Sequence, residues 1–193
     1  TGRVATAQGP NLFFNASTQL SFPITNDPDL RRIVGSGATL HDIAALEFDF
    51  TPTSDQISFE YVFASEEYCE YAGSSFNDVF GFFISGPGIN GPYENGAENI
   101  ARVPGSTEFV TINNLNYFSN EQYYINNVPA WHHGNMTFGL TCPSHTLDDG
   151  DFINEIEYDG FTRVLTAVAN VQACETYHIK LNVADVIEGY YES

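Results

Sequence analysis

Apolar and polar side chains alternate along most of the chain, while the 3.6-residue period of an amphipathic helix is nearly absent. Residues 46–50 place three apolar side chains on one face and two carboxylates on the other. Residues 57–63 continue the period of two after a turn at 51–55. Residues 79–84 are apolar on both faces, which is typical of a central strand. Further strands are predicted at 109–112, 162–168 and 177–183.

Long polar connections, rich in Asn, Gly and Pro, separate these predicted strands at 86–108 and 113–160. Connections of this length in a compact domain often carry function. Many short strands, long loops and no strong helix predict an all-β fold, namely a single β-sandwich of jelly-roll type over residues 1–193. A partly closed barrel is the alternative arrangement.

The composition limits the partners that this domain can have. The chain carries 25 Asp and Glu against 6 Lys and Arg, a formal net charge of −19, yet 42% of its residues are hydrophobic, as in a folded domain. The absence of a basic stripe excludes nucleic acid and argues against anionic membrane surfaces. No apolar run approaches the ~20 residues of a membrane span, so this segment is not expected to insert into a membrane. Cations are the partners that such a surface favours.

The densest polar cluster lies between two predicted strands. Glu66 and Glu67 end the first strand, and Asn77 and Asp78 begin the second, so their side chains can converge. Oxygen ligands without sulfur or imidazole suit a hard cation, and Ca²⁺ tolerates the irregular geometry of loops. The sequence therefore predicts a Ca²⁺ site at these residues. The alternative is a solvated acidic loop in which Asn77 and Asp78 are turn residues.

Other polar and aromatic positions have weaker interpretations. The acidic run at 148–151 lacks the spacing of a calcium loop and fits a surface turn, and Glu155, Glu157 and Asp159 fit the exposed face of a short strand. The three cysteines have no zinc-site spacing and leave a disulfide pairing open: Cys69, Cys142 and Cys174. Three aromatic residues in predicted loops are candidates for stacking on a glycan, with packing beneath the loops as the alternative: Tyr68, Tyr71 and Trp131.

Catalytic interpretations find little support in the chain. Glu66 with Glu67, or Glu47 with Asp49, could serve as the carboxylate pair of a polysaccharide hydrolase. Adjacent residues of a strand face opposite sides, however, and the chain contains no HExxH, GxSxG or Cys–His arrangement. We therefore expect a protein that is not an enzyme, with the hydrolase as an alternative.

Long motifs that together span most of the chain match one known pattern, including SEEY at 65–68, NDVFGFFISGPG at 77–88 and YDGFT at 158–162. On these motifs, together with 46–50, 59–64, 75–76, 98–101 and 174–183, the chain resembles the choice-of-anchor L domain of bacterial secreted and surface proteins. The resemblance implies extracellular display through varied anchoring signals, often those of type IX secretion, and no established catalytic activity.

The chain departs from that family in three places. Cys69 stands where the family typically has Pro, the segment 184–193 differs from the usual pattern, and the chain stops where the family continues into one more apolar strand. The resemblance therefore implies an excerpt of a larger surface protein, with an open sheet edge that another segment or a partner fills.

These observations lead to one expected function and one further alternative. We expect a secreted adhesion or recognition module of a bacterial surface, with Ca²⁺ as cofactor and a surface glycan or protein as partner. The alternative is a structural subunit of a surface filament or assembly, joined through edge strands.

Overall fold

The computed structural model describes residues 4–11, 26–68, 71–128, 152 and 154–187, and the chain is all-β, as predicted. Its helical segments are short, and α1 (Pro28–Val34) is the α-helix among them. The 3₁₀ turns are η1 (Val4–Ala7), η2 (Glu94–Gly96) and η3 (Glu121–Tyr123). The strands are β1 (Leu40–Phe50), β2 (Gln56–Tyr61), β3 (Ala64–Ser65), β4 (Val79–Ser85), β5 (Glu98–Asn99), β6 (Tyr124–Asn126), β7 (Gly160–Thr162), β8 (Leu165–Asn170) and β9 (Tyr177–Val186).

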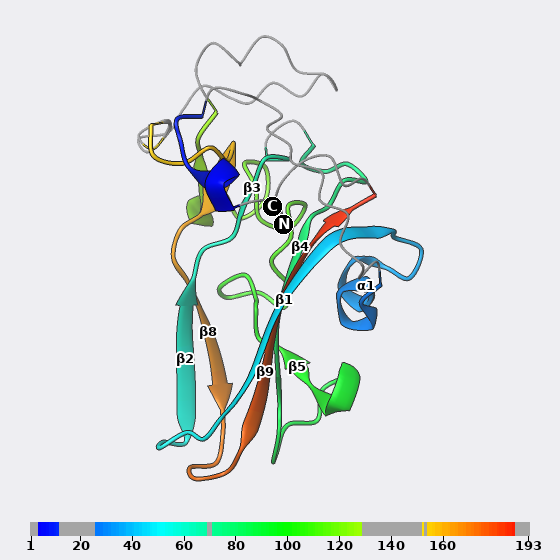
Figure 1. The fold of residues 1–193 in the computed structure, drawn as a ribbon, viewed down its shortest axis with the longest axis vertical. Coiled ribbons are helices and arrows are strands. Elements are labelled where there is room, and N and C mark those ends of the chain that lie inside the picture. The colour runs from blue at the N-terminus through cyan, green and yellow to red at the C-terminus, as the bar shows by residue number, and fades with distance from the viewer. Residues whose placement is uncertain (1–3, 12–25, 69–70, 129–151, 153, 188–193) are drawn as a thin grey trace.

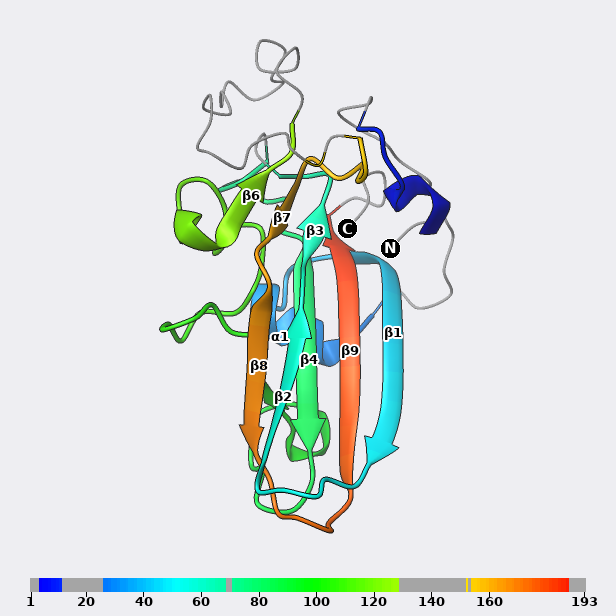
Figure 2. The ribbon, with the colours of Figure 1, turned by 90° about the vertical axis from the view of Figure 1, so that its left-hand side faces the viewer.

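Antiparallel pairing arranges the strands in three sheets (Figure 1). The largest has the order β1-β9-β4-β5, so β4 has a neighbour on each side, as its apolar faces predicted. A two-stranded ribbon pairs β2 with β8, and a short sheet has the order β3-β7-β6. The ribbon lies over the β4 side of the large sheet, and Figure 2 shows β9 and β1 extending beyond it. The jelly-roll type remains a prediction.

Aromatic side chains fill the space between the ribbon and the large sheet. The rings of Phe59 and Phe82 have their centroids 5.1 Å apart, and those of Tyr61 and Phe80 are also 5.1 Å apart. Phe50, at the end of β1, also packs against this core, with its ring centroid 6.3 Å from that of Phe59. The alternation of residues 57–61 therefore points one set of side chains into this core, while Ser58 and Glu60 remain exposed.

Two predicted strands differ from the structure for local reasons. The run at 162–168 is divided into β7 and β8, because the backbone N–H of Arg163 donates to Tyr123 O and its side chain to Gln122 O. Residues 109–112 form isolated bridges instead of a strand, since Val110 bonds to Ala101 and Ile112 to Asp78. Each segment thus divides its hydrogen bonds between two neighbours.

Helix α1 was not expected from the periodicity of the sequence. Asp27 caps it, because its Oδ1 accepts the Leu30 N–H at 2.9 Å, and Pro28 occupies the first turn. Gly35 ends it with a φ of 107°, a conformation that glycine adopts without steric cost. The helix packs on the outer face of the large sheet (Figure 1) and places Asp27 and Asp29 beside β9.

Candidate functional site

The predicted acidic site lies where β3 ends and β4 begins. Glu66, Glu67 and Asp78 are all almost fully buried, each at most 1% exposed. Ser65 Oγ donates to Asp78 Oδ2 at 3.1 Å, and Val186 N–H donates to Asp78 Oδ1 at 3.1 Å. The Glu67 and Asp78 side chains are also within hydrogen-bond reach of each other. The structure thus brings Glu67 and Asp78 into direct contact inside the domain.

Asn77, the fourth predicted ligand, has a different contact. Its Oδ1 accepts the backbone N–H of Asn113 at 2.9 Å, while the Asn113 side chain bonds to Ser74 O and to the Gly73 N–H. Asn77 therefore connects the loop before β4 to the distant segment at 113.

Burial changes the proton affinity of this site. Burial raises the pKa of Asp78 to about 6, although hydrogen bonds with Glu67, Val186 and Ser65 lower it in part. Burial and the neighbouring Asp78 charge also raise the pKa of Tyr68, whose hydroxyl has no hydrogen-bond partner in the described part of the chain. Chemically, the Glu67–Asp78 pair can share a proton, or a cation can offset its charge.

The raised pKa of Asp78 predicts a pH-dependent stability in metal-free protein. Between about pH 4 and pH 6 the folded state holds more protons than the unfolded state, so stability falls as the pH rises through this range. We expect the Asp78 contribution to fall by up to about 3 kcal/mol, measured by urea unfolding in EDTA. Asp78→Asn is the control, because it removes this titration, and an identical pH profile in both proteins would contradict the prediction.

The predicted glycan platform is corrected by the structure. Tyr68 is fully buried and Tyr71 is 7% exposed, because Tyr68 packs against Phe63 and Tyr124 while Tyr71 packs edge-on against Phe76. Both rings therefore fill the space beneath the loops and present no face to solvent. Trp131 lies outside the described residues.

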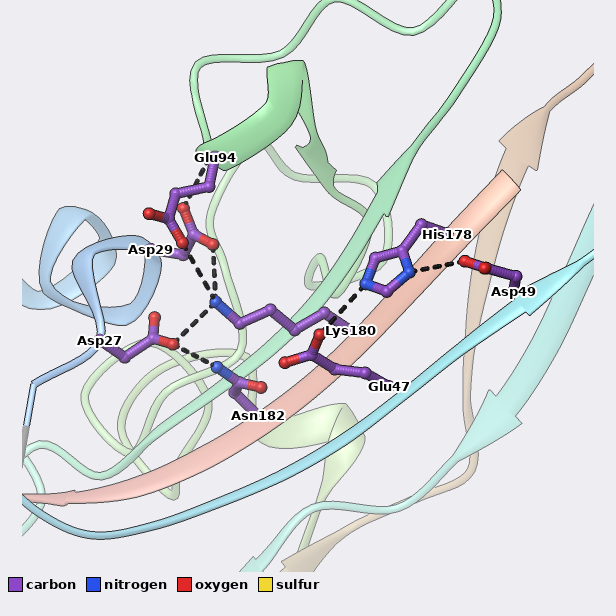
Figure 3. Close-up of polar contacts among 8 residues, drawn as sticks. All are labelled: Asp27, Asp29, Glu47, Asp49, Glu94, His178, Lys180 and Asn182. Carbon is purple, nitrogen blue, oxygen red and sulfur yellow. Dashed lines mark hydrogen bonds and ion pairs between the residues drawn. The ribbon is translucent and has the colours of Figure 1, made fainter. Parts of the chain in front are cut away.

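A second polar cluster, which the sequence did not suggest, lies on the outer face of the large sheet (Figure 3). Lys180 Nζ on β9 lies 2.7 Å from Asp27 Oδ2 and 2.8 Å from Asp29 Oδ2, and its side chain is only 14% exposed. Asn182 Nδ2 also donates to Asp27, at 2.6 Å. Burial of the ammonium opposes its charge, but the two aspartates outweigh this effect and raise the pKa of Lys180. This cluster fastens α1 to β9.

The exposed pair Glu47 and Asp49 lies next to this cluster. His178 Nδ1 is 2.8 Å from Asp49 Oδ1, and its Nε2 is 3.2 Å from Glu47 Oε2 (Figure 3). One imidazole therefore joins the two carboxylates that the hydrolase alternative would use as acid and base. Glu66 and Glu67, the other proposed pair, are buried.

The described residues lack the side-chain grouping that typically holds a metal ion in proteins. In the ranges that the structure describes, no three His, Cys, Asp or Glu side chains are grouped to hold a metal ion. A cation in this part of the chain would therefore need amide or backbone oxygens as well as carboxylates.

The pairing of the three cysteines stays open. Cys174 is an exposed free thiol, while Cys69 and Cys142 lie outside the described residues.

The fold and these sites define an acidic all-β domain with polar clusters at one end and on one face. The family model of the choice-of-anchor L domain matches residues 1–193, and the chain belongs to this family, whose domains occur in bacterial surface proteins. Neither the curated proteins nor the solved structures contain a match to this chain. Among the described residues, no helix is long and apolar enough to cross a membrane.

Proposed function

We propose that this domain is a non-catalytic recognition module displayed outside the bacterial cell, which binds an extended polypeptide segment along strand β2. The observation that carries the proposal is an exposed apolar strip beside an edge of β2 that no strand of the described residues pairs with. The strip is the inner face of β1 and β9 beyond the β2–β8 ribbon, and is defined here by Leu46, Phe48, Leu181 and Val183.

The strip is apolar yet accessible. Leu46 is 61% exposed and Phe48 is 38% exposed, although both lie on the face of β1 that continues into the core at Phe50. Leu46 pairs with Leu181 across the ladder, and together with Phe80 and Val183 they line a shallow groove. Contiguous exposed apolar surface of this kind is typical of interaction sites.

The adjacent strand edge supplies hydrogen-bonding groups. Among the described residues, β2 pairs with β8 along one edge and with no strand along the other. An extended segment added there would place its alternate apolar side chains on the strip and its other side chains outward. Backbone pairing would supply affinity, and the groove around Leu46 would supply selectivity.

The charge of the domain favours a basic partner over a second copy. Each copy has a formal net charge of −19, which opposes self-association, and Glu60 is exposed on the outer face of β2. We therefore assign the edge to a segment that alternates apolar residues with lysine or arginine.

The binding experiment uses a synthetic peptide of about ten residues that alternates Val and Lys, with a peptide of the same composition in two blocks as control. We expect the alternating peptide to bind and the block peptide to bind much more weakly, as measured by isothermal titration at physiological salt. Equal binding of both peptides would show that the net charge of the peptide alone determines its affinity, and this result would contradict the proposal. Dimerisation in analytical ultracentrifugation would assign the edge to a second copy instead.

Leu46→Gln provides the matched test of the strip. We expect a change in the free energy of unfolding within about 0.5 kcal/mol, because the side chain is largely exposed. We expect the alternating peptide to bind about fivefold more weakly, since the peptide would cover this side chain. Val164→Gln, at an equally exposed position outside the strip, should bind as the native protein does. Unchanged peptide affinity in Leu46→Gln would show that the strip is not used.

We also propose that Ca²⁺ binds at the acidic end of the domain, where the carboxylates of Glu66, Glu67 and Asp78 are buried. The burial of three carboxylates in a chain of this charge supports the proposal, because a divalent cation would offset their repulsion. A Ca²⁺ concentration of 100 times Kd should stabilise the domain by about 2.7 kcal/mol. An unfolding temperature that is the same in CaCl₂ and in EDTA would contradict Ca²⁺ binding.

A further inference from the structure

We infer that the side-chain oxygens of Asn11, Asn127, Asp159 and Glu66 form the Ca²⁺ site of this domain. The inference rests on the proposed Ca²⁺ binding and assigns its ligands. This assignment places the ion at the end of the short β3-β7-β6 sheet and not between Glu67 and Asp78.

The register of the short sheet brings three of these residues together. Gly160 on β7 pairs with Ser65 on β3 and with Asn126 on β6. The next position along the ladder holds Asp159 and Asn127, joined by a 2.8 Å bond from the Asn127 N–H to Asp159 O. Glu66 directly follows Ser65 at the same end of the ladder. Strands distant in the sequence thus bring two carboxylates and an amide to one place.

The N-terminal segment supplies the fourth residue. Asn11 Nδ2 donates to Asp159 Oδ1 at 2.9 Å and to Asn127 O at 3.1 Å. The amide group of Asn11 therefore contacts the Asp159 carboxylate directly through its nitrogen, and its Oδ1 belongs to the same group. The segment itself is held by a 2.9 Å bond from the Gly9 N–H to Glu155 O.

Among the residues that the structure describes, two amide oxygens in this group have no hydrogen bond. Asn11 and Asn127 are both fully buried, and within the described residues neither Oδ1 has a partner. Both orientations are fixed by the nitrogens, since Asn127 Nδ2 donates to Ile156 O at 3.0 Å and to Tyr158 O at 2.9 Å. A buried acceptor without a partner costs about 1–3 kcal/mol, so two such oxygens on residues that contact Asp159 indicate a bound group that accepts their lone pairs.

The ligand chemistry selects the ion. Two amide oxygens and two carboxylates are hard oxygen donors, without sulfur or imidazole, on a turn, a loop and an N-terminal segment. Ca²⁺ accepts amide and carboxylate oxygens in irregular geometry, whereas Mg²⁺ requires a near-ideal octahedron. By contrast, both oxygens of Asp78 already accept hydrogen bonds, from Ser65 and Val186.

The test measures Ca²⁺ affinity by isothermal titration of CaCl₂ into protein stripped with EDTA. We expect Asp159→Asn and Asn11→Ala each to weaken binding at least about tenfold, as loss of a ligand does. We expect Asp78→Asn and the exposed control Asn90→Ala to bind within about twofold of the native protein. Far-UV circular dichroism checks the fold of each variant, and if Asp159→Asn does not fold, Asn11→Ala decides the result.

The outcomes separate this inference from the broader proposal. If the native protein binds no Ca²⁺, both fail. If Asp78→Asn abolishes binding while Asp159→Asn and Asn11→Ala retain it, Ca²⁺ binding stands and the ligand assignment is overturned. A loss of less than about tenfold in Asn11→Ala and in folded Asp159→Asn also overturns the assignment.

Discussion

Replacing Lys180 with methionine is expected to lower the free energy of unfolding by about 3–5 kcal/mol. Methionine preserves most of the aliphatic volume, but Asp27 and Asp29 would keep their burial and lose their counter-charge at 2.7 and 2.8 Å. Urea denaturation near neutral pH measures the change. The matched control is Arg102→Met, which breaks the exposed ion pair with Glu98 and should cost less than about 1 kcal/mol.

A second substitution distinguishes lost charge from lost packing. If the cost of Lys180→Met comes from uncompensated carboxylates, then adding Asp29→Asn should recover part of the lost stability, giving a non-additive double-mutant cycle. Strict additivity of the two changes, or a Lys180→Met cost no larger than that of Arg102→Met, would contradict the role assigned to this cluster.

Truncation of Phe82 to alanine is the other change with a large expected effect, again about 3–5 kcal/mol. Phe82 is 1% exposed, and its ring lies within 6.4 Å of Phe59, Tyr61 and Phe80, so its removal leaves a cavity between ribbon and sheet. Urea denaturation again provides the measurement. Phe118→Ala, at a position 59% exposed, should change stability far less, and equal losses at both sites would refute this account of the core.

Much of the sheet architecture could be predicted from the sequence, because alternation records which face of a strand is buried. The central position of β4 followed from apolar residues on both its faces, and the outward face of β1 followed from Glu47 and Asp49. Helix α1 could not be found by periodicity, since seven residues make only about two turns. The division of 162–168 depends on Arg163 bonding to residues 122 and 123, a contact that no local pattern encodes.

The candidate sites were less predictable because their residues come from distant segments. Adjacency at the strand ends led to the grouping of Glu66 and Glu67 with Asn77 and Asp78, but it did not reveal that the three carboxylates are buried. Asn11, however, lies 116 residues before Asn127, and 148 before Asp159, so only the tertiary structure brings them into contact. Asp159 was expected on an exposed face, because the alternation at 155–159 does not reveal that the N-terminal segment covers it.

The position of β9 has a mechanical consequence for a domain whose family occurs in bacterial surface proteins. This strand pairs with β1 along one edge and with β4 along the other, and its Lys180 is also bound to α1. The hydrogen bonds of antiparallel ladders lie perpendicular to the strands, so a force directed along β9 loads both ladders together in shear. Extraction of this strand would then require simultaneous rupture of two rows of bonds, which makes β9 the element best placed to carry tension through the domain.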